Sequence, residues 1–78
     1  MIIAIGNQLI NQDAVQYAEI DRNNLAIAFY FYRGEWGCRA YTYESGKELE
    51  LAWKNYGDAC INEVPWVELK GVNYKGFE

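Results

Sequence analysis

Residues 25–43 read LAIAFYFYRGEWGCRAYTY and contain two runs of aromatic and small side chains joined by a loop. In the first run, large apolar residues alternate with alanine and tyrosine, a period of two that is typical of a β-strand. Gly34 and Gly37 flank Glu35 and Trp36, and glycine permits the backbone angles that tight hairpin loops need. These features predict a β-hairpin whose second strand covers residues 38–43.

The length of the hairpin loop decides which side chains share a face of the sheet. An even loop centred on Glu35 and Trp36 places Tyr30 opposite Tyr41 and Tyr32 opposite Arg39. One outward face then carries Tyr30, Tyr32, Arg39, Tyr41 and Tyr43. The inward face is apolar and holds Leu25, Ile27, Phe29, Phe31, Cys38, Ala40 and Thr42. A loop of odd length would scatter the tyrosines over both faces, and we expect the even loop.

Three further strands are predicted before the hairpin, over residues 2–5, 8–10 and 14–20. Turn-forming residues separate them at positions 6–7 and 11–13, and the turn-prone residues 21–24 lead into the hairpin. Sequential strands that are joined by short turns usually pair with each other. The simplest topology is therefore an antiparallel meander.

After Tyr43 the periodicity changes to that of a helix. Leu49, Ala52, Trp53 and Tyr56 form one apolar stripe, with Trp53 expected in the core. Ser45 and Glu48 have the spacing of a capping box at a helix start, and Gly57 offers a left-handed stop. The helix is predicted over about residues 46–56.

The last part of the chain allows fewer conclusions. Residues 64–69 form an edge strand in this interpretation, because Pro65 removes one donor from the ladder. Residues 70–78 form either a loose tail or an extension that docks on a second subunit through Tyr74 and Phe77. The fold predicted for residues 1–78 is a single α+β domain, in which one helix packs on a strongly bent antiparallel meander of four to five strands.

Composition limits the chemistry of the protein. Seven basic and eleven acidic side chains give a net charge of −4, which disfavours a nucleic-acid partner. There is no histidine, and Cys38 and Cys60 alone cannot complete a tetrahedral zinc site. The two thiols are either reduced or joined in one disulfide. The acidic residues of the first strands are attributed to strand alternation and turns, so no metal or cofactor is expected; these are Asp13, Glu19 and Asp21.

The opening apolar segment, residues 1–5, is too short for a secretory signal or a membrane span. The sequence therefore predicts a cytoplasmic protein that does not contact a membrane.

The segment Ile5-Gly6-Asn7-Gln8-Leu9-Ile10-Asn11 is followed by Asp13, Val15, Tyr17, Glu19 and Ile20. This pattern resembles the opening of small uncharacterised bacterial proteins that combine a β-meander with a C-terminal helix, and residues 44–53 resemble the start of their helix. The resemblance covers residues 1–56. It implies a pleckstrin-homology-like bent sheet closed by one helix, and it implies no activity. The chain after Gly57 departs from the pattern.

The sequence carries no catalytic motif, and we expect a non-enzymatic protein-interaction module. Interface energy concentrates in tryptophan, tyrosine and arginine, so the predicted partner-binding residues are Trp36, Tyr30, Tyr32, Tyr41, Tyr43 and Arg39. The partner is another protein or a second copy in a homodimer, and the module acts as a regulator or inhibitor, for example a phage product that blocks a host defence complex.

Trp36 either contacts that partner or folds back on the sheet. The alternative function is a small-ligand or single-stranded nucleic-acid binder, in which bases stack on the tyrosines and Arg39 meets a phosphate. A third interpretation is that the tail covers the tyrosine face.

Overall fold

The computed structural model describes residues 1–32 and 37–74. In chain order the elements are β1 (Ile2–Ile5), β2 (Gln8–Asn11), a 3₁₀ helix (Gln12–Ala14), β3 (Val15–Asp21), β4 (Ala26–Phe31), β5 (Cys38–Thr42), α1 (Gly46–Ile61), β6 (Trp66–Leu69) and β7 (Val72–Asn73). The predicted α+β class, with a bent meander packed by one helix, is confirmed.

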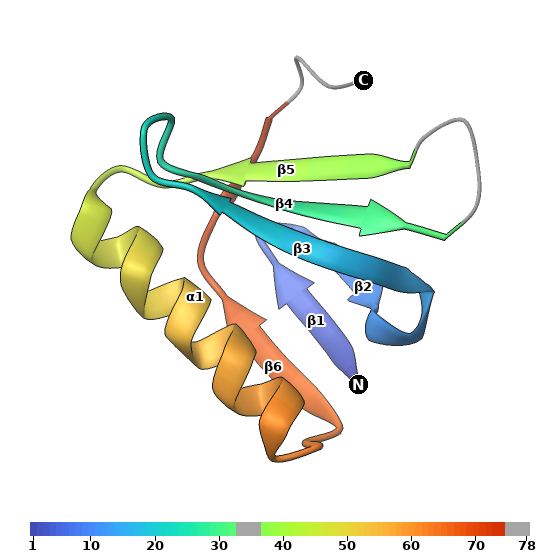
Figure 1. Ribbon diagram of the computed structural model, residues 1–78. Coiled ribbons are helices and arrows are strands. Elements are labelled where there is room, and N and C mark those ends of the chain that lie inside the picture. The colour runs from blue at the N-terminus through green and yellow to red at the C-terminus, as the bar shows by residue number, and fades with distance from the viewer. Residues whose placement is uncertain (33–36, 75–78) are drawn as a thin grey trace.

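The strands form two sheets that pack on each other (Figure 1). The four-stranded sheet has the order β3-β4-β5-β7 and contains the last three strands of the predicted meander, while its first two strands, β1 and β2, belong to the three-stranded sheet of order β2-β1-β6. β1, β6 and α1 lie on the same side of the four-stranded sheet, below it in Figure 1. β6 is an edge strand, as Pro65 indicated, and it runs parallel to β1.

The core fills the space between the two sheets and α1. Ile3 and Ile5 come from the three-stranded sheet, Ile27 and Phe29 from β4, and Leu49 from the helix. All five side chains are fully buried, and each burial stabilises the fold by roughly 1.5–3 kcal/mol. The helix stripe packs as predicted, and Trp53 lies partly buried against the same cluster.

The predicted hairpin register is wrong, because Tyr30 pairs with Cys38 and not with Tyr41. The observed pairing is displaced by three residues, from 41 to 38, and an odd displacement moves every side chain of β5 to the opposite face. Tyr41 consequently pairs with Ile27 on the core side of the sheet, and Ala40 pairs with Ala28 on the opposite side, where Ala40 is still only 2% exposed. This register places the large rings in the core and the small side chains on the opposite side of the sheet, which removes more apolar surface from water.

The predicted end of the helix is also wrong, because α1 continues through Gly57 to Ile61. Ser45 caps the start as expected, and its Oγ accepts a hydrogen bond of 3.2 Å from the Glu48 amide. A glycine inside a helix costs only about 1 kcal/mol. The final turn recovers this cost, since it buries Ala59 and bonds the Ala59 carbonyl to the Val64 amide.

Candidate functional site

The structure separates the residues that were predicted to form one binding face. Tyr41 is fully buried and Tyr43 is buried, so both rings belong to the core. Arg39 lies opposite Phe29, on the inward side of the sheet, and lines a hollow of about 320 Å³ beside β2. Tyr32 is exposed at the end of β4. Of the predicted site, Tyr30 alone reaches the groove described below, and Trp36 lies outside the described residues.

Tyr30 has a partner that the sequence did not suggest. Its ring stacks on the ring of Tyr17 from β3, with centroids 4.4 Å apart and planes 12° from parallel. Tyr17 precedes Glu19 and Asp21 at a spacing of two residues, and this alternation was a usable signal that β3 turns these three side chains outward. A shift of register between Val15 and Tyr17 brings Tyr17 opposite Tyr30.

The side of the four-stranded sheet that faces away from the core is called the outer face here. Two rows of side chains cross it at right angles to the strands. The first row is Glu19, Ala28, Ala40 and Tyr74, and the second is Asp21, Ala26, Thr42 and Val72. Four small side chains, Ala26, Ala28, Ala40 and Thr42, thus occupy the middle of the face.

These small residues form the floor of a groove of about 520 Å³, called the alanine groove here. The walls of the groove come from β3 at one edge of the sheet, from the segment at β7 on the other edge, and from one end of β4. Among the described residues, the lining is Glu19, Asp21, Asn24, Ala26, Ala28, Tyr30, Ala40, Thr42 and Tyr74. The groove arises because each row has small side chains in its middle and larger side chains at its two ends.

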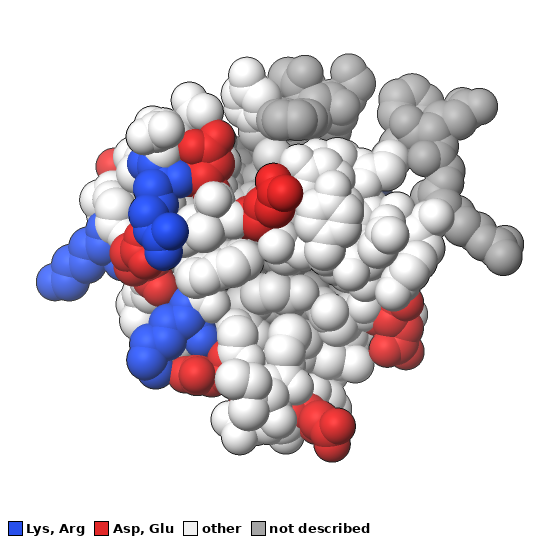
Figure 2. Space-filling view, in the orientation of Figure 1, with Lys and Arg blue, Asp and Glu red and all other residues white. Residues whose placement is uncertain are grey.

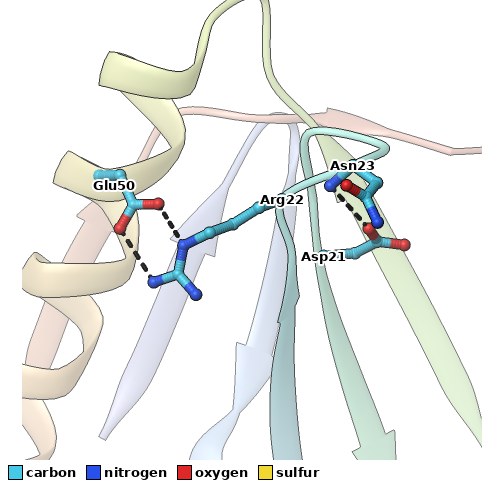
Figure 3. Close-up of polar contacts among 4 residues, drawn as sticks. All are labelled: Asp21, Arg22, Asn23 and Glu50. Carbon is cyan, nitrogen blue, oxygen red and sulfur yellow. Dashed lines mark hydrogen bonds and ion pairs between the residues drawn. The ribbon is translucent and has the colours of Figure 1, made fainter.

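The charged side chains among the described residues that line the groove are acidic. In the view of Figure 2, Lys and Arg side chains gather over the α1 side of the molecule, while acidic side chains are spread more widely. Arg22 follows Asp21 in the chain, but its guanidinium reaches toward the helix and donates to both Glu50 oxygens at 2.6 and 3.1 Å (Figure 3). Among the described residues, no Lys or Arg lines the alanine groove.

The two carboxylates differ in their surroundings. Asp21 Oδ1 accepts hydrogen bonds from the Asn23 amide (Figure 3) and from the Asn24 amide in the β3–β4 turn. A further bond, which the Asp21 side chain accepts from the Asn24 side chain, is the largest cause of the lowered pKa of Asp21. Glu19 makes no hydrogen bond or ion pair within residues 1–32 and 37–74. Its negative charge, after burial and the nearby Cys38, contributes to the raised pKa of Tyr30. The Glu19 charge therefore acts on Tyr30, a side chain that lines the groove.

A second hollow of about 360 Å³ lies between α1 and β6. Its lining includes Glu48, Glu68 and Lys70, so charges of both signs meet there. The alanine groove is larger, and its described charges have one sign, so it is the stronger candidate for a binding site.

Cys38 and Cys60 are both free thiols, and burial is the largest cause of the raised pKa of Cys38. Among the described residues, no group of three acidic or cysteine side chains is placed to hold a metal ion. No described helix is long and apolar enough to cross a membrane.

Comparison with known proteins gives no relative, since no protein-family model, curated protein or solved structure matches this chain.

The buried phenols make the fold sensitive to alkali. Burial raises the pKa values of Tyr41 and Tyr43, and it raises the pKa of Tyr56 to about 12. In the unfolded chain these groups ionise near pH 10. Above that pH the unfolded state binds fewer protons than the folded state, so the free energy of unfolding falls as pH rises. Each phenol contributes about 1.4 kcal/mol per pH unit in this range.

Tyr43→Phe tests this linkage. Among the described residues, the Tyr43 hydroxyl is buried without a hydrogen-bond partner, so its removal is expected to preserve or slightly raise stability at neutral pH. Above about pH 10 the variant should lose stability less steeply than the wild type, by about 1.4 kcal/mol per pH unit. Urea denaturation at a series of alkaline pH values measures both slopes, and parallel curves would contradict the burial of this phenol.

Proposed function

We propose that this protein is a non-enzymatic binding module that holds an extended segment of a partner protein in the alanine groove. The single observation that carries the proposal is the small-residue floor across the outer face. Sheets with one solvated face usually present polar side chains there. Here the floor is mostly alanine, and Tyr30 and Tyr74 stand at the walls.

The dimensions of the groove suit an extended chain. Glu19 on β3 and Tyr74, which directly follows β7, are three strand spacings apart, which is about 14 Å. A segment that runs along the strands would lie between these two side chains, with alternate side chains directed at the floor. Tyrosine is enriched at protein interfaces because it buries a large area at a low cost in conformational entropy.

A protein that holds a segment of its partner in this groove would act as a regulator or inhibitor of that partner, including one directed at a host complex. A second copy of the chain is the competing occupant, and it would make the protein a homodimer. The nucleotide-binding alternative is less well supported, because Arg39 lies opposite Phe29 and away from Tyr30.

Panning of a random peptide library tests the proposal. Ala28→Arg places a long side chain on the groove floor and is expected to abolish the enrichment of peptides that the wild type shows. Asn62→Arg adds the same charge at the exposed end of α1 and serves as the matched control, with enrichment equal to the wild type. Circular dichroism and urea denaturation confirm that each variant is folded.

Enrichment of the same peptides on all three proteins, or of none on any, would contradict the proposal. Light scattering of the three proteins separates the competing occupant. A wild-type dimer that Ala28→Arg dissociates would assign the groove to a second copy of the chain.

A further inference from the structure

One row of the alanine groove places an acidic group and an aromatic ring at opposite ends of a small-residue floor. Glu19 pairs with Ala28, Ala28 pairs with Ala40, and the Tyr74 amide donates to the Ala40 carbonyl at 2.8 Å. The side chains directly across from Glu19 are therefore methyl groups.

The negative charge at this position has no counterpart within the described residues. Arg22, the basic residue nearest in sequence, is held by Glu50 on the α1 side, and Asp21 is occupied by the amides of its own turn. Glu19 remains exposed and without an ion pair among the described residues. A cation entering the groove would therefore meet a carboxylate that does not first have to break an existing ion pair.

The aromatic walls suit the same kind of ligand. Tyr30 and Tyr74 both line the groove, and the electron-rich face of a tyrosine ring attracts ammonium and guanidinium groups. The methyl floor matches the aliphatic stem of a lysine or arginine, which prefers apolar surface while its charged end reaches a polar partner. Phosphate and carboxylate ligands are disfavoured, since they would be repelled by Glu19 and Asp21.

Building on the proposed function, we propose that the alanine groove selects segments that carry a cationic side chain, lysine or arginine. The stem of this side chain lies over Ala28, beside the buried Ala40, and its charged group meets Glu19. The walls formed by Tyr30 and Tyr74 exclude water from the stem. The partner is therefore a protein with a basic, extended segment.

Fluorescence anisotropy with defined peptides tests this assignment. The probes are labelled peptides of alternating lysine and alanine, and of alternating glutamine and alanine, so that the second has a neutral polar side chain at every position where the first has a cationic one. The wild type is expected to bind the lysine peptide, with affinity that falls as salt is added, and to bind the glutamine peptide at least about 10-fold more weakly.

Glu19→Gln removes the charge at the groove and keeps the size of the side chain. It is expected to weaken binding of the lysine peptide by about 5- to 10-fold. Glu63→Gln makes the same change in net charge at the exposed end of α1, far along the chain from the groove, and should leave the affinity within about 2-fold. Equal losses in both variants would mean that net charge alone attracts the peptide, and would overturn the assignment.

The two proposals fail in different ways. If both peptides bind equally and Ala28→Arg abolishes both, the groove binds segments without selecting a cation, and the present inference is wrong while the proposed function stands. If Ala28→Arg leaves the lysine peptide bound, the groove is not its site, and this inference is overturned. Binding of neither peptide to the wild type also overturns this inference, and the library panning then decides the proposed function separately.

Discussion

Tyr41→Ala is expected to lower the free energy of unfolding by about 3–5 kcal/mol, the range found when large aromatic side chains are removed from a core. Tyr41 is fully buried, its ring meets the Phe29 ring edge-on at 5.9 Å, and its hydroxyl donates to Gln8 on β2. Domains of this size are stable by about 4–12 kcal/mol in total. The variant should therefore be largely unfolded or close to unfolding at room temperature.

Tyr32→Ala is the matched control for this prediction. Tyr32 lies at the end of β4 and is 65% exposed, so its removal should change stability by less than about 0.5 kcal/mol. Urea denaturation of both variants measures the difference. Similar losses in the two variants would mean that the tyrosines of β4 and β5 share one environment, as the even hairpin loop predicted.

Gly6→Ala is expected to lower the free energy of unfolding by about 2–4 kcal/mol, for two independent reasons. Gly6 has φ of +59° in the two-residue turn between β1 and β2, a conformation that strains an alanine. A Cβ at this position would also lie 2.9 Å from the Gly71 carbonyl oxygen, closer than real contacts allow. The obstacle is backbone, so it cannot move aside as the end of a flexible side chain would.

Gly57→Ala makes the same chemical change without either obstacle. Gly57 lies inside α1, and nothing approaches within 4 Å of the position that its Cβ would take. Alanine should therefore stabilise the helix by about 0.5–1 kcal/mol. Thermal unfolding of the two variants beside the wild type gives the comparison, and a similar effect in both would contradict the close contact of Gly6 with Gly71.

The sequence predicted local structure well because local signals determine it. Period-two alternation and turn residues placed the strands of the meander, and the spacing of Ser45 and Glu48 placed the start of the helix. The end of the helix was predicted too early, because a glycine such as Gly57 ends a helix only if the chain turns away from the helix at that residue. Here the burial of Ala59 continues it. Such tertiary contacts are not visible in a local pattern.

The binding face was predicted less well, because register depends on pairing between strands. Residues 38–43 alternate cysteine, alanine and threonine with arginine and two tyrosines, so either set fits an outward face by periodicity alone. Volume decides between them. Each buried tyrosine removes roughly 150–250 Å² from water, and the core therefore takes Tyr41 and Tyr43 while the alanines form the groove. The parallel pairing of β6 with β1 joins segments about sixty residues apart, and no turn signal indicates it.

The central claim is that Ala28 and Ala40 lie opposite each other on the outer face. In the β4–β5 ladder, the Phe31 amide donates to the Gly37 carbonyl at one end and the Tyr43 amide donates to the Leu25 carbonyl at the other, so these are hydrogen-bonded pairs. Hydrogen-bonded and non-hydrogen-bonded pairs alternate along an antiparallel ladder, and Ala28 and Ala40 therefore form a non-hydrogen-bonded pair. Such pairs bring their α-protons close together. A strong nuclear Overhauser effect between the α-protons of Ala28 and Ala40 is the expected result, and one between the α-protons of Tyr30 and Tyr41 would contradict the account.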